Sequence, residues 1–209
     1  MIIQIIIGKI KHMKKLYLTL VFSFVLSIFC FADKVFHGYI ITKNGKRLTG
    51  YFTEVIYTGY SSQVVFINDF GSSYQISPEL IRAFVYRKKN DYLVYESKRL
   101  NTAWVFLKVV FKGDDLLLYR SPEYLTKFIV GYEKIETQKF EANDFFIQKP
   151  GGKLRRLRKI NYRKRLRKLI RKRAPELAEK IGSKGYKFAN LFDIMLEYNE
   201  ICERTKYKL

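Results

Sequence analysis

The stretch that decides the fold class is residues 35–57, which read VFHGYIITKNGKRLTGYFTEVIY. It holds two runs rich in β-branched and aromatic residues, 35–42 and 47–57, on either side of Lys-Asn-Gly-Lys at 43–46. Asn and Gly both tolerate a positive φ angle, so an Asn-Gly pair between two such runs is a strong signal for a β-hairpin. The stretch therefore predicts two antiparallel strands joined by a tight turn.

The same alternation of short apolar runs and turn residues continues to about residue 160. A parallel sheet would need crossover connections between its strands, usually helices, and no helical pattern separates these runs. We therefore predict an α+β chain that is mostly β: an antiparallel meander forming a roll, a barrel-like sheet or a sandwich, with two to three C-terminal helices. Residues 77–81 are expected to form one helical turn, with Pro78 at its first position. Further strands are expected at 63–68, 73–76, 82–87, 91–96, 104–112, 116–120, 127–136 and 144–148, with a last one ending near 160.

Residues 153–173 are the most basic part of the chain, with thirteen Lys or Arg and no acidic residue. We expect an amphipathic helix from Tyr162 to Arg173, with Asn161 as its N-cap. At 3.6 residues per turn, the apolar residues of this helix fall on one side: Tyr162, Leu166, Leu169 and Ile170. This side is expected to pack on the sheet, which leaves the cations on the outside.

The strand pattern ends near residue 160 and a helical pattern follows it. We therefore predict two regions: a β-rich domain at 33–160 and a basic helical segment at 161–209 that packs on it. Within the second region we expect one helix from Pro175 and another that begins near Asn190. The last helix carries Cys202, which we expect to be buried.

Residues 13–32 have the order of a secretory signal peptide. Lys14 and Lys15 precede the apolar run 16–29, and residues 30–32 offer small side chains at the two positions that a signal peptidase reads. This order predicts export, which places the protein in the periplasm, at the outer membrane or outside the cell.

Residues 1–12 precede this signal, and we interpret them as a mis-annotated start or an extended positively charged region. The alternative to cleavage is that residues 16–32 stay as an N-terminal membrane anchor, close to the shortest length that spans a bilayer. The whole chain has 40 Lys and Arg against 19 Asp and Glu, a net charge of +21. Removal of residues 1–32 takes away four lysines and no acid, so the remainder carries +17.

Several short motifs after the predicted signal peptide carry a resemblance to a protein family. They are Gly38-Tyr39-Ile40, Asn44-Gly45, Leu48-Thr49-Gly50-Tyr51, Tyr74, Ser77-Pro78-Glu79, Ile81-Arg82-Ala83-Phe84, Pro175-Glu176-Leu177 and Tyr198-Asn199. With them, residues 34–203 resemble an uncharacterised family of small secreted proteins of Bacteroidetes-type bacteria. The resemblance implies export and a β-rich body with a helical tail, and it implies no activity or site. The arginine content of 155–173 departs from a typical member.

The expected exported part contains no motif of a known enzyme class. It has one histidine, His37, and one cysteine, too few for the usual zinc ligand sets. It lacks a Gly-x-Ser-x-Gly nucleophile elbow, a phosphate-binding loop and a dinucleotide fingerprint. The adjacent carboxylates Asp114 and Asp115 follow a glycine and indicate a turn. We therefore expect no catalytic residue, no metal and no cofactor, with a carboxylate-based hydrolase as the alternative.

The basic segment 153–173 carries the functional hypothesis. Arginine forms bidentate contacts with phosphate and carboxylate groups, and the envelope offers both in lipopolysaccharide, phospholipid head groups and acidic glycans. The candidate anion-binding residues are Arg155, Arg156, Arg158, Arg163, Arg165, Arg167, Arg171 and Arg173. The alternatives are a solvated outer helix face with no ligand, another envelope protein as partner, or a nucleic acid if the chain is not exported.

Overall fold

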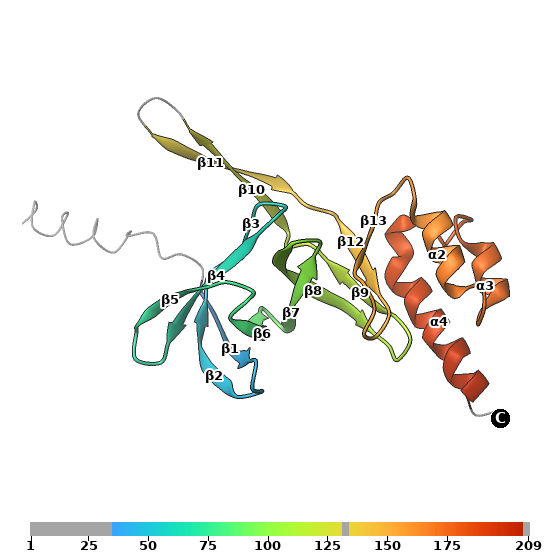
Figure 1. Cartoon of the computed structure of the whole chain (residues 1–209), viewed down its shortest axis with the longest axis horizontal. Helices are drawn as coiled ribbons and strands as arrows, with labels where there is room; N and C mark the ends of the chain where they lie inside the picture. The colour runs from blue at the N-terminus through green and yellow to red at the C-terminus, as the bar shows by residue number, and fades with distance from the viewer. Residues whose placement is uncertain (1–34, 131–133, 207–209) are drawn as a thin grey trace, which may run out of the picture. The chain divides into compact units, whose positions relative to one another are not determined.

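The computed structural model describes residues 35–130 and 134–206 (Figure 1). The expectations for residues 1–12 and 13–32, and the alternative anchor at 16–32, lie outside these residues. In the described part the strands are β1 (Phe36–Thr42), β2 (Arg47–Phe52), β3 (Ile56–Tyr57), β4 (Ser62–Asn68), β5 (Ser73–Ile76), β6 (Ile81–Lys88), β7 (Asp91–Leu100), β8 (Ala103–Lys112), β9 (Leu117–Arg120), β10 (Tyr124–Val130), β11 (Ile135–Glu141), β12 (Phe145–Gln148) and β13 (Arg155–Leu157). The helices are α2 (Tyr162–Ile170), α3 (Pro175–Lys180), the short 3₁₀ helix η1 (Phe188–Asn190) and α4 (Leu191–Lys206).

The strands confirm the predicted fold class, α+β and mostly antiparallel β. The main sheet has the order β13-β12-β9-β8-β7-β6-β1-β2-β4-β3, with β5 also paired to β4. Consecutive strands from β6 to β9 form the expected meander, and β1 joins it by pairing with β6. The path has two ends, so the barrel-like alternative is wrong. Short strands stand at both ends, β3 with two residues and β13 with three, and β13 runs on towards α2.

The sheet curls, and this brings together strands that are not neighbours in the strand order. The backbone N–H of Phe106 on β8 donates a hydrogen bond of 2.6 Å to the hydroxyl of Ser62 on β4. Both residues are buried. Because of the curl, β8 is covered on both faces: Phe106 packs in one hydrophobic cluster, while Val105 and Leu107 pack in another. The sheet therefore corresponds most closely to the predicted roll.

The local predictions for residues 127–136 and 77–81 are wrong. Residues 127–136 were expected to form one strand, but the chain reverses there, and Val130 of β10 pairs with Ile135 of β11. The apolar residues on both sides of Gly131 look like one continuous strand in the sequence. Residues 77–81 form a hydrogen-bonded turn, closed by the Leu80 N–H to the Ser77 carbonyl at 3.1 Å, and not a helical turn. Ile81 is the first residue of β6, and its side chain is buried in the hydrophobic core.

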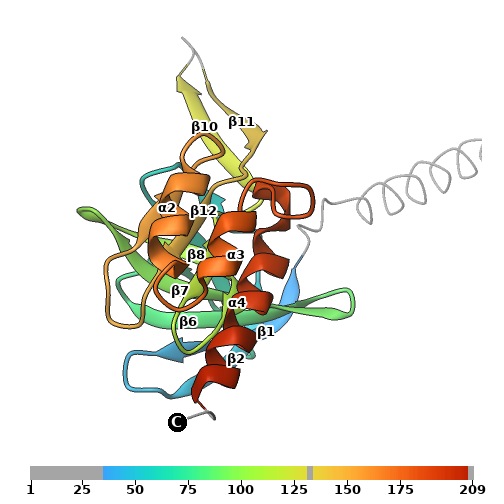
Figure 2. The same cartoon turned by 90° about the vertical axis from the view of Figure 1, so that its right-hand side faces the viewer.

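The helices lie beside the β12–β13 end of the sheet (Figures 1 and 2). Side chains from α2, α3 and α4 share one hydrophobic cluster with the strands, and the cluster includes Leu118, Ile147, Leu157, Leu166, Ile170, Leu177, Met195 and Cys202. The predicted apolar side of α2 is thus in the core, with Leu169 only partly buried. Cys202 is a free and buried thiol, as expected. No helix in the described ranges is both long enough and apolar enough to cross a bilayer.

The ends of α2 differ from the prediction. The helix stops at Ile170 rather than at Arg173, and the backbone N–H of Arg173 donates to the Ile170 carbonyl in a turn that leads into α3. Asn161 occupies the N-cap position, but its side chain does not cap the helix. Its Oδ1 accepts a hydrogen bond of 2.9 Å from the backbone N–H of Arg158 instead, which closes the loop between β13 and α2.

Glu96 is a largely buried carboxylate that links three strands. Its Oε2 lies 2.8 Å from the Lys98 ammonium and accepts a 2.9 Å hydrogen bond from the Tyr119 hydroxyl, and the Lys112 ammonium lies 3.4 Å from its Oε1. Burial by itself would raise the pKa of Glu96. The hydrogen bonds from Lys98 and Tyr119, with the charges of Lys98 and Lys112, outweigh the burial and hold this pKa below its ordinary value of 4.5.

We expect Glu96→Gln to lower the free energy of unfolding at neutral pH and to have a smaller effect in acid. The folded-state pKa is depressed, so the stabilisation is present above pH 4.5 and is lost as the pH falls through the folded pKa. Urea unfolding at about pH 7 and about pH 3 measures both values. Glu136→Gln is the control. Glu136 forms an exposed ion pair with Lys134, and such a pair contributes little to the free energy of unfolding. An equal loss for Glu96→Gln at both pH values would contradict the assignment.

Candidate anion-binding surface

The structure places all eight candidate arginines on the surface. They come from β13, from the loop after it, from α2 and from the turn after α2, so they belong to one continuous stretch of chain that lies over the β12–β13 end of the sheet (Figure 2). The eight side chains are nevertheless not equivalent, because about half of them already have protein partners.

Two of the eight form ion pairs with carboxylates of the β-rich part. Arg156 pairs with Asp144, and Arg173 pairs with Asp115 in the turn between β8 and β9. The Asp115 carboxylate raises the pKa of Arg173 further above its ordinary value. Because these guanidinium groups are partly neutralised by protein carboxylates, they are weaker candidates for an external anion than the sequence suggests.

Two more arginines of α2 donate to backbone carbonyls. Arg165 Nη1 donates to the Arg156 carbonyl at 2.5 Å, which ties α2 to β13. Arg167 Nη2 donates to the Ile181 carbonyl at 2.8 Å and lies 3.4 Å from the Glu179 carbonyl, and so ties α2 to the end of α3. Helix ends leave carbonyl groups without helical partners, and Arg167 satisfies one of them. These two side chains have a structural role.

The remaining four, Arg155, Arg158, Arg163 and Arg171, have no side-chain hydrogen bond or ion pair with another residue of the described part of the chain. Arg163 packs beside Gly182, where a Cβ atom would lie 2.7 Å from its Nε. Gly182 has a φ of 100°, which glycine adopts without strain, and the absence of a Cβ leaves room for the Arg163 side chain. The four arginines can therefore meet an external anion without breaking a hydrogen bond or ion pair within the described part of the chain.

A cavity of about 340 Å³ opens between the β12–β13 turn and α2. We call it the basic pocket. Its charged lining consists of cations alone, with no Asp or Glu, and Ile147 and Leu169 supply its apolar wall. The five cations that line it are Lys149, Lys153, Arg155, Arg165 and Lys168. They converge from three elements, so the pocket is a product of the tertiary structure.

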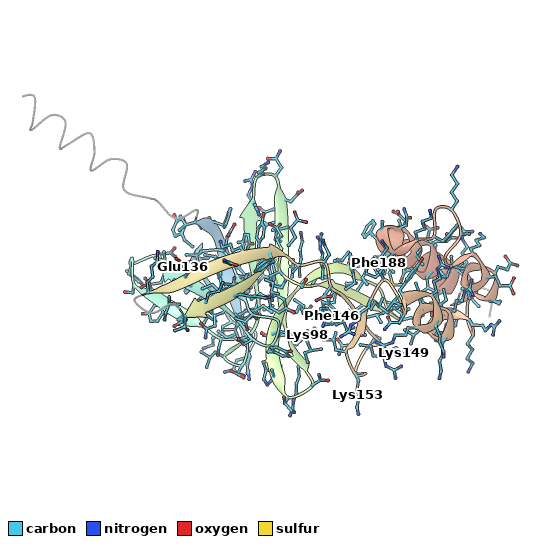
Figure 3. The ribbon with its side chains drawn as sticks, turned by 90° about the horizontal axis from the view of Figure 1, so that it is seen from above. Lys98, Glu136, Phe146, Lys149, Lys153 and Phe188 are labelled. Atoms are coloured by element: carbon cyan, nitrogen blue, oxygen red, sulfur yellow. The ribbon has the colours of Figure 1, made fainter. Side chains whose placement is uncertain are left out.

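The turn that carries two of these lysines has a defined geometry. Lys149 accepts a 2.8 Å hydrogen bond through its carbonyl from the Gly152 N–H, and Gly151 has a φ of 68°, which suits the third position of a type II turn after Pro150. Gln148 Nε2 also donates to the Gly152 carbonyl at 2.7 Å. Figure 3 shows Lys149 and Lys153 near this turn, between the sheet and the helices. Both side chains are therefore presented by a hydrogen-bonded turn.

Lys149 is not among the residues predicted from the sequence, and Lys153 and Lys168 are predicted only as part of the basic segment 153–173. A signal was present: Pro-Gly-Gly at 150–152 predicts a turn, and a turn brings the residues on either side of it together. The approach of α2 to that turn has no comparable signal in the sequence.

The other polar residues singled out from the sequence lie apart from this surface. His37 on β1 is exposed, and its ring meets the Tyr51 ring edge-on at 5.2 Å. Asp114 and Asp115 lie in the turn between β8 and β9, where Asp115 holds Arg173. Within the described ranges, no group of three or more His, Cys, Asp or Glu side chains is placed to hold a metal ion.

Comparisons of the chain with protein-family models, with curated proteins and with solved structures give no match. The family resemblance and the export expected from the sequence therefore stay predictions.

We expect Arg167→Gln to lower the free energy of unfolding by about 1 kcal/mol, since it removes the donor to the Ile181 carbonyl. Arg171→Gln is the matched control, because it removes the same charge from an exposed position and should change stability by less than about 0.5 kcal/mol. Chemical denaturation of both variants checks this. Equal effects would mean that Arg167 is only a surface charge.

Proposed function

We propose that this chain is an exported, non-enzymatic envelope protein that binds anionic surfaces through the basic segment 153–173. The observation that supports it is a set of exposed arginines without an ion pair to another described residue: Arg155, Arg158, Arg163 and Arg171. Arg155 also lines a pocket with four other cations and no carboxylate. A solvated outer face of a helix needs no such pocket.

The ligands that suit this surface carry phosphate or carboxylate groups. A guanidinium group presents paired N–H donors that match two oxygens of either group. In the envelope such oxygens belong to lipopolysaccharide phosphates, phospholipid head groups and acidic glycans. Nucleic acid offers the same phosphates, and predicted export is the reason for placing it second.

The mode of binding follows from the packing of α2. An amphipathic helix can lie in a membrane interface when its apolar side is free to enter the acyl region. Here Leu166 and Ile170 are fully buried against the sheet and the other helices. The helix therefore offers its cations to an anionic surface and keeps its apolar side in the core, so binding is electrostatic and sensitive to salt.

Export is tested by the intact mass of the native protein in separated cell fractions. The proposal expects a mass that matches residues 33–209, found in the periplasmic or surface fraction. A full-length species in the inner membrane would instead identify residues 16–32 as an anchor. A full-length species in the cytoplasm would contradict export and favour nucleic acid as the partner.

Surface binding is tested by co-sedimentation with vesicles that contain anionic lipid or lipopolysaccharide. The four unpaired arginines, Arg155, Arg158, Arg163 and Arg171, are changed together to Gln. Binding should fall by at least about tenfold, since each cation near an anionic membrane contributes about 1 kcal/mol. High salt should weaken binding of the unchanged protein as well.

The control for this variant removes the same charge from the β-rich part. Lys46, Arg82, Lys89 and Arg99 are exposed side chains without a hydrogen bond or ion pair to other described residues, and all four are changed to Gln. The control should keep most of the binding. Equal losses in the two variants would show that net charge alone attracts the protein, and unchanged binding in both would refute the proposed surface.

A further inference from the structure

We propose that the basic pocket is a binding site for a multiply charged phosphate group, a phosphomonoester or a diphosphate. This inference deepens the proposed function and rests on it for the biological setting, because it names the chemistry that one part of the surface selects. The pocket would thus distinguish one class of phosphate from the general negative charge of a membrane.

The first argument is the charge of the lining. Lys149, Lys153, Arg155, Arg165 and Lys168 line a cavity of about 340 Å³, and no carboxylate lines it with them. Like charges that line one small cavity repel one another, and a concave site with partly apolar walls screens this repulsion less than open water does. A bound anion relieves this repulsion, and one with two charges relieves more of it than one with a single charge.

The second argument is that the backbone that carries the turn lysines is set, and the Arg165 guanidinium anchored, before any ligand arrives. The type II turn and the Gln148–Gly152 hydrogen bond set the backbone around Lys149 and Lys153. The Arg165 guanidinium is anchored to the Arg156 carbonyl through Nη1, which leaves its other N–H groups for a ligand. Arg155 lies on β13, directly opposite Ile147 of β12. A site with little reorganisation left to perform loses less entropy on binding.

The third argument is the match between donors and ligand oxygens. A phosphomonoester carries a charge of about −1.5 to −2 and three strong acceptor oxygens, whereas a phosphodiester in a lipid chain carries a single charge. Two arginines supply paired donors and three lysines supply point charges, so the lining has donors for every oxygen of a monoester or diphosphate. The volume is also within the range of small-ligand sites.

The soluble test uses inorganic pyrophosphate and the full chain, by calorimetric titration. The pocket variant changes Lys149, Lys153 and Lys168 to Gln and leaves Arg165 in place, because Arg165 has a structural contact. The control variant changes Lys46, Arg82 and Lys89 of the β-rich part to Gln, which removes the same charge outside both the pocket lining and the basic segment. The proposal expects saturable one-to-one binding by the unchanged protein and the control, and at least about a tenfold weaker affinity for the pocket variant.

A second readout shows whether the pocket variant is folded. Removal of three crowded cations should leave its melting temperature without ligand equal to or above that of the unchanged protein. Pyrophosphate should then raise the melting temperature of the unchanged protein and the control more than that of the pocket variant. Non-saturable binding, or equal weakening in both variants, would overturn the pocket as a site.

The membrane test compares vesicles of phosphatidylcholine that contain either phosphatidic acid, a phosphomonoester, or phosphatidylglycerol, a phosphodiester, at matched surface charge. The unchanged protein should prefer phosphatidic acid, and the pocket variant should lose the preference while it still binds both lipids. Pyrophosphate binding without any vesicle binding would refute the proposed surface function and keep the pocket as a site for soluble phosphates. Vesicle binding without either selectivity or pyrophosphate binding would refute the pocket alone.

Discussion

The packing of α2 on the β12–β13 end of the sheet is the contact on which the candidate site depends. Leu166 and Ile170 of the helix share a core with Ile147 and Leu157 of the strands. Once the apolar side of α2 is buried there, its Lys and Arg side chains have to face outward. The same contact sets α2 beside the turn at 149–153, and the basic pocket lies between them. One hydrophobic contact therefore determines both the direction and the spacing of the cations.

The distribution of carboxylates gives the surface its character. The part of the chain after residue 32 carries +17, and thirteen of its cations lie at 153–173, so the rest carries +4. Asp144 and Asp115 are placed to neutralise Arg156 and Arg173 at the border with the β-rich part. The pocket lining receives no carboxylate at all. Arg156 and Arg173, near the two ends of the basic segment, are thus paired with carboxylates, while the cations of the pocket are not. Cations without carboxylate partners are what a binding surface for anions requires.

Much of the β-rich part could be predicted from local patterns. The hairpin at 43–46, the strand at 73–76 and the turn at 150–152 follow from Asn-Gly, Pro-Gly and alternating apolar residues. The errors share one cause. The reversal within 127–136 and the turn at 77–81 depend on how side chains pack in the tertiary structure. A window of a few residues does not contain that information. The pairing of β1 with β6 and the contact of Ser62 with Phe106 are likewise long-range.

The sequence by itself determined the fold class, the amphipathic character of α2 and the concentration of positive charge at 153–173, because composition and periodicity are local properties. The tertiary structure alone decided how the sheet curls and ends, and which of the eight arginines are engaged by carboxylates or carbonyls. It also decided that Lys149 and Lys168 line the same pocket. These results depend on distances between residues far apart in the chain, and such distances are fixed only when the hydrophobic core between α2 and the strands has formed.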